Sequence, residues 1–587
     1  MVAHCVILWW AFCLQAIGRA MSQQPKRRRA ATEAKLHRIQ TLQTTGINNA
    51  KLLRLAKRIK EKPAVLDDVS SLRVLKETAH ELFDAVKAEA HRFALDDGSE
   101  FVWEYASARK CLAEFTRRSA NFKDMLASLH ARTPCTMAAP WHWIVYFDET
   151  TPGSVLRQDN RRKSWAFYVS IRELGPAVLQ HEAAWLPIAV LRAGVQKTII
   201  GRFSCCTKVF FNTLLIADGN LRTDGLVLRL RRDEPVLIFV TMGNILSDAA
   251  ALKDMWGVKG AGGLIPCSFC VNICGTDDGE DTLLGHDGSH RIFDIRCRHP
   301  TDFVLKSSGD WYVQADTLQA LEPRLRSSDF ELVQKAYGMT YNQHGIIYDL
   351  NLRPLMPPVE ISRYDPMHCI CSNGIGQTEI DLFLKAMHNL EPPVGFDALR
   401  TLAGATWVFP SCRGQSNKLK TDILSVSREK LFLKKKTLYL SASDTLTVIP
   451  FLRYFGERVL GAILPLEVAS MSALGAMVGV YLCGKRGFQV ADELDAAILR
   501  HDVAFEAAYG GAADEYVPKF HFTKHIPEQL RLDGFLQDCF ATERKHSLVL
   551  QAAEPVRNTR SFERSVLARA LIMHLDDTKH LRQDAFI

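Results

Sequence analysis

The chain has 587 residues and a net charge of +8; 47% of its residues are hydrophobic, 24% are charged, and 15 are cysteines. These values lie near the averages of globular proteins, which excludes a wholly disordered, collagen-like or coiled-coil chain, and the length predicts two to four domains or one heavily inserted domain. The cysteine density is far below that of a disulfide scaffold, which favours a reducing compartment and leaves metal binding or burial as roles for cysteine.

The first residues form an apolar run that has two interpretations. Residues 5–18 are about 14 apolar-rich residues, fewer than the roughly 20 that span a bilayer. The run resembles a secretory signal, or it lies upstream of a translation start at Met21. No Lys or Arg precedes it, which argues against secretion. No later segment has the length and lack of charge of a transmembrane helix, so we expect no membrane contact.

The positive charge is concentrated in the next segment. Residues 1–65 hold 13 Lys and Arg residues and two acidic ones, a net charge of +11, which leaves −3 on the rest of the chain. The basic run at 25–29 includes Arg27, Arg28 and Arg29. Such a run is typical of nuclear import or nucleic-acid binding, and also of a solvated tail. Residues 48–62 predict an amphipathic helix that either docks on the body or contacts DNA.

The body begins helical and then becomes a mixed sheet. Helical periodicity runs over 66–132, with a break at 96–98. Strand patterns then follow at 143–149, 165–171, 184–193, 225–230 and 235–242, with a helix at 203–215. No Gly-rich phosphate loop follows any strand, so the pattern predicts a mixed α/β sheet rather than a nucleotide-binding fold. Beyond about 275 the chain is loop-rich and then mostly helical, with helices expected at 330–337, 378–387, 469–482 and 491–507.

Three carboxylates are candidates for metal chemistry. Asp148 ends the strand WIVYFDE, where the sheet would hold it rigidly, whereas alternation sends Glu149 to the other face. Asp248 follows a strand and is also a good helix N-cap. Glu543 lies near the start of a helical stretch, where a surface salt bridge with Arg544, Lys545 or Lys524 is the alternative.

If these carboxylates converge, they would hold two Mg²⁺ ions roughly 3.5–4 Å apart, a clamp for in-line phosphoryl transfer. The loop at 155–164 supplies basic side chains that could bind DNA phosphates beside such a site, namely Arg157, Arg161, Arg162 and Lys163.

A C-x-x-C motif predicts half of a zinc site. Cys267 and Cys270 have the spacing that can place two thiolates on one Zn²⁺, although burial or redox chemistry is the alternative. The segment DPMHCIC offers the other half: His368, with Cys371 or Asp365 as fourth ligand. Cys274 is a further candidate.

Taken in order, these segments resemble the transposases of CACTA-like cut-and-paste transposons, particularly the Plavaka-type branch. The matching pieces are YFDETTPGSVLRQDNRRKSWAFYVSI, SDAAALKDMWGVKGAGGLIPCSFC, YDPMHCICSNGIG, and PKFHFTKH followed by CFATERKH. The second catalytic Asp of that family precedes C-x-x-C by about the distance from Asp248 to Cys267, and its D-x-x-H motif matches Asp365 and His368. The resemblance covers roughly 140–550.

The resemblance implies an α/β fold with an RNase H-like mixed sheet core, a large helical insertion and a helical, basic N-terminal region. The expected parts are a signal-like or untranslated segment (1–20), a basic arm (21–65), a helical region (66–140), the first part of the core (141–275), the insertion (276–535) and a C-terminal part carrying the Glu (536–587). Asp148, Asp248 and Glu543 would be the catalytic triad, and Cys267, Cys270 and His368 the structural zinc ligands.

The activity so implied is DNA strand cleavage and transfer with Mg²⁺ or Mn²⁺, acting on transposon ends and target DNA in the nucleus. The chain would work as a homo-oligomer, without a small-molecule substrate. The alternatives are an inactive or domesticated DNA-binding descendant of such an enzyme, or a secreted protein led by residues 1–20.

Overall fold

A computed structural model describes much of residues 71–587, and the chain divides into two compact units, Met1–Glu81 and Leu82–Ile587. The positions in 71–587 that it does not describe are 155–156, 159, 218–219, 231–233, 261–262, 266, 272, 275–291, 294–302, 405–418, 511–517, 557 and 582–587. The predicted segments at 1–20 and 21–65, with Arg27, Arg28 and Arg29, lie outside the described residues. The candidate site residues from Asp148 onward belong to the second unit.

The largest sheet of the described residues is mixed and five-stranded, so the chain is an α/β protein. Its order is β13 (Ser362–Tyr364), β10 (Val240–Ser247), β3 (Trp141–Thr150), β6 (Ser164–Ile171) and β7 (Leu186–Arg192). β3, β6 and β7 pair antiparallel, whereas β10 and β13 run parallel to β3. All of β6 and most of β3 and β10 are buried, as expected for strands covered on both faces. The strands predicted near 143–149, 165–171 and 184–193 are confirmed.

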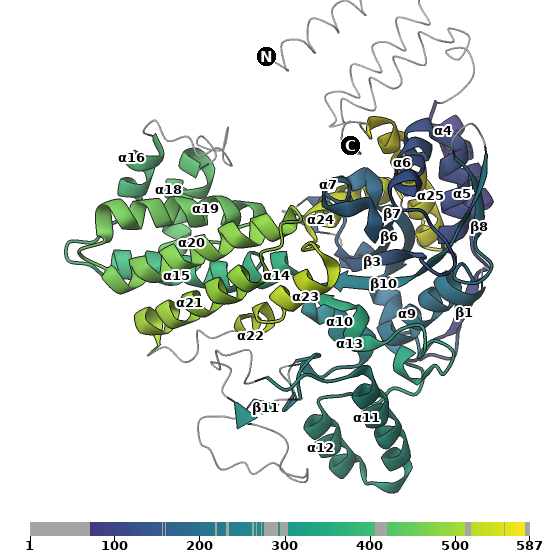
Figure 1. The fold of residues 1–587 in the computed structure, drawn as a ribbon, viewed down its shortest axis with the longest axis horizontal. Helices are drawn as coiled ribbons and strands as arrows, with labels where there is room; N and C mark the ends of the chain where they lie inside the picture. The colour runs from purple at the N-terminus through teal and green to yellow at the C-terminus, as the bar shows by residue number, and fades with distance from the viewer. Residues whose placement is uncertain are drawn as a thin grey trace, which may run out of the picture. The chain divides into compact units, whose positions relative to one another are not determined.

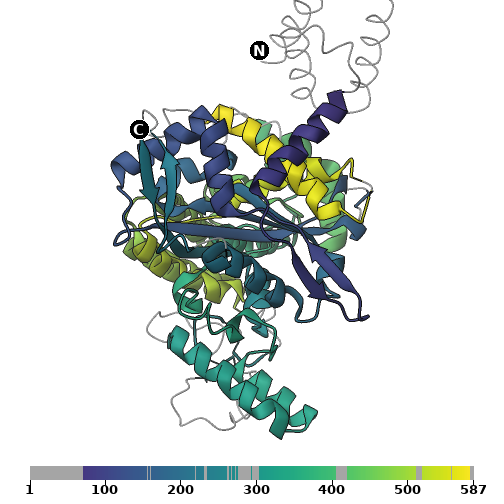
Figure 2. The same cartoon turned by 90° about the vertical axis from the view of Figure 1, so that its right-hand side faces the viewer.

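Helices cover both faces of this sheet (Figure 1, Figure 2). On one face lies α24 (Phe540–Ala553), where Tyr168 contacts the His546 ring, and α25 (Phe562–Asp577) packs against α24 and β7. On the other face lies α9 (Arg202–Asn212), whose Phe203 ring centroid is 5.4 Å from that of Phe147. Because successive strand residues point to opposite faces, Asp148 lies on the α24 side.

The pairing of β10 with β3 contains a one-residue shift at Gly243. A Cβ atom at Gly243 would lie 2.7 Å from the Cβ of His142 and 2.9 Å from the carbonyl oxygen of Trp143. A side chain therefore does not fit there, and glycine allows β10 to bulge against its neighbour.

Beyond this bulge the register brings two acidic residues together. Leu246 pairs with Tyr146 in parallel. Two residues further along each strand, Asp248 comes beside Asp148 at the same end of the sheet. The pairing of β3 with β10 thus juxtaposes two residues that are a hundred positions apart in the sequence.

The strand predicted at 235–242 is wrong in its extent. It is two strands: β9 (Pro235–Ile238) pairs with β8 (Leu226–Arg229) in a separate hairpin, and β10 then runs from Val240 to Ser247. β9 is largely exposed whereas β10 is buried on both faces, so one hydrophobic run serves two environments. Asp248 consequently follows its strand directly.

The region predicted as helical at 66–140, with a break at 96–98, contains a β-hairpin. Helices α4 (Ser71–Val86), α5 (Ala108–Arg118) and α6 (Ala120–Arg132) are present, but β1 (His91–Ala94) and β2 (Glu100–Trp103) lie between them. The break at 96–98 is the hairpin turn, with Gly98 at φ +80° and the Ser99 N–H donating to Asp97. The Trp103 indole N–H donates to the Val190 carbonyl oxygen (2.9 Å), which fixes the hairpin on β7.

The segment predicted as an insertion at 276–535 is mostly helical where it is described, but it also completes the sheet. Besides α11 (Ser308–Leu321) and α12 (Ser327–Tyr337), it contributes β13, which pairs with β10. A three-residue strand is too short to show a period in the sequence. The segment 276–535 is therefore not purely an insertion, because β13 within it belongs to the core sheet.

The remaining helices of this segment include α15 (Ile375–His388), α19 (Ala442–Phe455), α20 (Pro465–Lys485) and α21 (Ala491–Tyr509), which pack together (Figure 1). The helices predicted at 330–337, 378–387, 469–482 and 491–507 are confirmed. Of the described helices, α20 alone has the length and apolar composition to cross a membrane, contrary to the expectation that no later segment would. Its buried residues include Met471, Leu474 and Met477.

Candidate functional site

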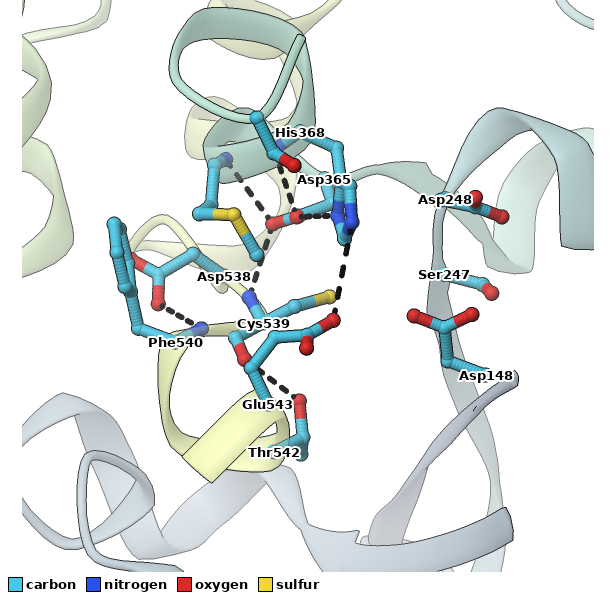
Figure 3. Close-up of polar contacts among 12 residues, drawn as sticks. Asp148, Ser247, Asp248, Asp365, His368, Asp538, Cys539, Phe540, Thr542 and Glu543 are labelled. Carbon is cyan, nitrogen blue, oxygen red and sulfur yellow. Dashed lines mark hydrogen bonds and ion pairs between the residues drawn. The ribbon is translucent and has the colours of Figure 1, made fainter. Parts of the chain in front are cut away.

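Asp148, Glu543 and His368 meet at an end of the sheet, and Asp248 follows the adjacent strand there. Ligand atoms of Asp148, Glu543 and His368 all lie within 4.8 Å of one another. Asp148 lies on β3, Glu543 lies in the first turn of α24, and Asp248 directly follows β10. In Figure 3 the Asp148 and Glu543 carboxylates face each other and the His368 ring lies beside Glu543, whereas the Asp248 carboxylate, beyond Ser247, points away from Glu543.

Asp248 acts as the N-cap that its sequence predicts. Its Oδ1 accepts a hydrogen bond from the Ala251 N–H (2.6 Å), which starts α10 (Ala249–Trp256). The preceding Ser247 donates its hydroxyl to the carbonyl oxygen of Phe147 (2.8 Å) and so ties the end of β10 to β3. The two interpretations of Asp248 are compatible, because the cap uses one carboxylate oxygen and the other remains for a ligand.

Glu543 has none of the salt bridges that were its alternative. Among the described residues, Arg544 pairs with Glu182, Lys524 with Asp502 and Lys545 with Asp577. Each predicted partner is thus engaged elsewhere, and the Glu543 carboxylate faces the sheet.

Tyr146 joins Glu543 to the strand that carries Asp148. Its hydroxyl lies 2.9 Å from Glu543 Oε1 and 3.1 Å from Asp148 Oδ2, and it also lies 3.3 Å from His546 Nε2. Sequence reasoning missed this residue. The signal was its position two residues before Asp148, which puts both side chains on one face of the strand.

The cluster concentrates negative charge in a half-buried place. Burial, together with the charges of Asp248 and Glu543, raises the pKa of Asp148 to about 8. Carboxylate oxygens are the ligands that Mg²⁺ prefers, and a divalent cation would relieve this repulsion. Asp148 and Glu543, with His368 beside them, could therefore hold a divalent cation, whereas Asp248 at the neighbouring strand end lies outside this group.

His368 belongs to this site and not to the cysteines, so its prediction as a zinc ligand is corrected. Asp365 caps α14 (Pro366–Ile370) by accepting from the His368 backbone N–H (2.9 Å), and its Oδ2 lies 2.5 Å from His368 Nδ1. This contact points Nε2 at Glu543 Oε1, 3.8 Å away. Burial alone would lower the pKa of His368, but Asp365, Glu543 and Asp148 raise it to about 9.

The cysteines instead meet two histidines that were not predicted. Sγ of Cys267 and Sγ of Cys270 lie 3.3 and 3.4 Å from Nε2 of His525, which lies 3.2 Å from Nε2 of His521. All four residues are buried, and their ligand atoms lie within 4.8 Å of one another. Two cysteines and two histidines at such distances could hold a metal and fit Zn²⁺. The missed signal was the H-x-x-x-H spacing in HFTKH, which places both rings on one side of a helical turn.

Electrostatics favours one thiolate in this group, because the hydrogen bond with Cys267, together with burial, raises the pKa of the Cys270 thiol. Burial would raise the pKa of the Cys267 thiol, but the Cys270 thiol and the two histidines hold it well below its usual value. A low thiol pKa suits a metal ligand, because the thiolate is the form that binds. The alternatives Cys371 and Asp365 are outside this group, and the side chain of Cys274 is not among those described.

The predicted DNA-binding loop is only partly available for phosphate. Arg162 is buried, and its Nη1 donates to the carbonyl oxygens of Ala553 and Glu554 (both 3.2 Å) at the end of α24. This placement corrects the prediction for Arg162. Lys163 pairs with Glu149, which confirms that Glu149 points away from the carboxylate cluster.

Arg161 is exposed, and the side chain of Arg157 is not among those described. Of the four predicted loop residues, Arg161 and Lys163 thus remain candidates on the protein surface. Comparison with known proteins adds no further candidate: no family model and no curated protein matches this sequence.

Proposed function

We propose that the chain is a metal-dependent polynucleotidyl transferase of the cut-and-paste transposase type, which cleaves DNA strands and joins the freed 3′ end to target DNA. The observation that carries the proposal is the meeting of Asp148 and Glu543, with Asp248 placed at the neighbouring strand end. Asp148 lies near the end of β3, Asp248 directly follows the adjacent parallel strand β10, and Glu543 comes from a helix on the Asp148 face of the sheet. No single motif in the sequence has comparable weight.

The sheet supports an RNase H-like core as its framework. Three successive antiparallel strands are followed by two strands added in parallel beside the first, in the order β7, β6, β3, β10, β13. The candidate carboxylates lie on the first strand of this series and directly after the fourth. A rigid sheet suits this purpose, because metal ligands on strand ends keep their separation when substrate binds.

When bound, a pair of divalent ions would activate the attacking oxygen and stabilise the leaving one. The protein's own contribution is to fix the ligands. Asp248 is held by its N-cap bond, Asp148 by the sheet, and Glu543 by Tyr146. His368, oriented by Asp365, adds a ring N–H beside Glu543, where it could contact a phosphate oxygen of the DNA.

The second group, Cys267, Cys270, His521 and His525, would hold a structural Zn²⁺. Closed sites of two cysteines and two histidines stabilise folds and have no open position for substrate. The group joins the segment after α10 to the turn between α22 (Lys519–Thr523) and α23 (Ile526–Asp533). We propose that zinc there holds the insertion against the core.

The decisive experiment measures nicking of supercoiled plasmid DNA by the purified chain with Mg²⁺ or Mn²⁺. We expect Asp148→Asn, Asp248→Asn and Glu543→Gln each to lower the rate by about a thousandfold, since a bound ion supplies several kcal/mol of transition-state stabilisation. Glu149→Gln is the matched control, because this neighbouring carboxylate faces away and should be dispensable.

Two outcomes would contradict the proposal. Nicking that survives Asp148→Asn would remove the site assignment. A wild-type chain that binds DNA without nicking it would favour the DNA-binding descendant of a transposase instead.

A further inference from the structure

Helix α18 (Val426–Lys435) presents a cluster of lysines to solvent. Lys430, Lys434, Lys435 and the C-cap residue Lys436 are all exposed. Within the described part of the chain none of these four side chains forms an ion pair. Nothing in the fold of the helix requires so many like charges on its surface, since like charges four residues apart, such as Lys430 and Lys434, repel.

The acidic residue of the helix is turned the other way. Glu429 lies 2.9 Å from Nη2 of Arg400, and it accepts from the backbone N–H of Phe396 at the start of α16 (Phe396–Gly404). Phe432, buried on the same side, lies with its ring centroid 5.6 Å from that of Phe396. The contacts with α16 thus neutralise Glu429 and leave the outer side of α18 positively charged.

Lys436 gives an independent indication that charge matters here. It ends the helix at φ +57°, in the left-handed region that favours glycine, and its N–H caps the Phe432 carbonyl oxygen. Lys434 and Lys435 lie in the last turn, where the helix dipole stabilises cations. The helix dipole does not account for Lys430, which precedes the last turn. Nor does it account for Lys436, which occupies a left-handed position that favours glycine.

We infer that the outer side of α18 is a contact surface for the phosphate backbone of duplex DNA, separate from the reaction centre. The inference rests on the proposed function in taking DNA as the substrate. Figure 1 shows α18 at the end of the helical part that is distant from α14 and α24. At this remove from α24, the lysines would contact DNA that flanks the reacting bond rather than the bond itself.

The test compares charge-removing variants of the full chain by their salt dependence of binding to a fluorescent duplex of arbitrary sequence. Each lost phosphate contact lowers the slope of log K against log salt by roughly 0.9, so Lys430→Gln/Lys434→Gln should lower it by roughly 2. The matched control is Arg324→Gln/Lys335→Gln, which removes two exposed charges near α12 and should leave the slope unchanged.

Lys436→Gly separates binding from folding. Glycine suits the left-handed backbone, so this variant should melt at the wild-type temperature or above it, yet its slope should fall by roughly 0.9. An equal slope in wild type and α18 variants, with plasmid nicking intact, overturns the α18 surface and leaves the proposed function standing.

Absence of both DNA binding and nicking in the wild type would overturn both. Vesicles containing phosphatidylserine provide a third arm of the experiment. If the α18 variants lose binding to these vesicles while their DNA slope is unchanged, the surface serves a membrane and the inference is wrong.

Discussion

At the scale of single residues, the surroundings of Asp148 in the folded protein disfavour its ionised form. It is half-buried on the sheet, and desolvation together with the charges of Asp248 and Glu543 raises its pKa from the ordinary 3.8 to about 8. An acid with a pKa raised in this way is retained at a cost in stability, which is typical of functional sites.

This environment predicts how stability depends on pH in metal-free protein. Because the pKa of Asp148 is raised in the folded state, folding favours the protonated form, and stability should fall as pH rises from about 4 towards 8. We expect Asp148→Asn, which imitates the neutral acid, to unfold at higher urea concentration than wild type at pH 8 and at the same concentration near pH 4. Urea unfolding in EDTA at both values measures this. A variant less stable than wild type at pH 8 would contradict it, and Mg²⁺ should narrow the difference by stabilising wild type.

The sequence predicted single residues correctly where strand alternation determines the face on which a side chain lies. Alternation along one strand chose Asp148 over Glu149, and the structure agrees because Glu149 pairs with Lys163. It could not choose the partner of Cys267. His368 and His525 are both histidines near motifs of the right kind, and only the tertiary fold decides which ring reaches the thiols.

At the scale of elements, α24 is held at both ends. Tyr146 contacts Glu543 in its first turn, and Arg162 binds the carbonyl oxygens of Ala553 and Glu554 in the last. A cation at a helix C-terminus satisfies orphan carbonyls and complements the helix dipole. Arg162 therefore positions the helix that carries a candidate metal ligand.

We expect Arg162→Ala to lower the free energy of unfolding by about 1.5–3 kcal/mol, the range for hydrogen bonds to charged groups. Its DNA-binding slope against salt should stay at the wild-type value, because the guanidinium contacts the protein rather than phosphate. Chemical denaturation and the fluorescent duplex measure the two quantities. Unchanged stability with a shallower slope would restore Arg162 as a DNA contact.

Elements were predictable where a pattern had room to repeat. The long helices α20 and α21 and the buried strand β6 were found with little error. The three-residue β13 was too short for a pattern, and the β1–β2 hairpin was hidden because it has only one well-buried residue per strand.

At the scale of the whole molecule, the two candidate metal sites are joined by the end of β13 and the residue after it. Tyr364 ends β13, and its hydroxyl lies 3.5 Å from Sγ of Cys267. The next residue, Asp365, orients His368 in the carboxylate site. Two neighbouring residues therefore connect the group of Cys267 and His525 to the carboxylate site.

This connection predicts an asymmetric result. His525→Asn should lose the zinc ion, lower the melting temperature and also reduce nicking, since Tyr364 and Asp365 would lose their support. His368→Asn should keep about one zinc ion per chain while nicking falls. Metal analysis of the purified variants, with melting and nicking measured on the same samples, decides. Loss of zinc in His368→Asn would return that residue to the cysteines.

The bulge at Gly243 has a consequence for how this chain tolerates changes in length. It accommodates one extra residue in β10. The strand residues 240–242 therefore pair with β3 in one register, and residues 244–246, which lead to Asp248, pair in another. Deleting a residue between 244 and 247 would move Asp248 back by one position, about 3.3 Å, and turn its side chain to the opposite face. Insertions within the long segment after α10 spare this register. Sequence drift can therefore lengthen the loops freely, while the few residues from the bulge to Asp248 must keep their number even where their identities change.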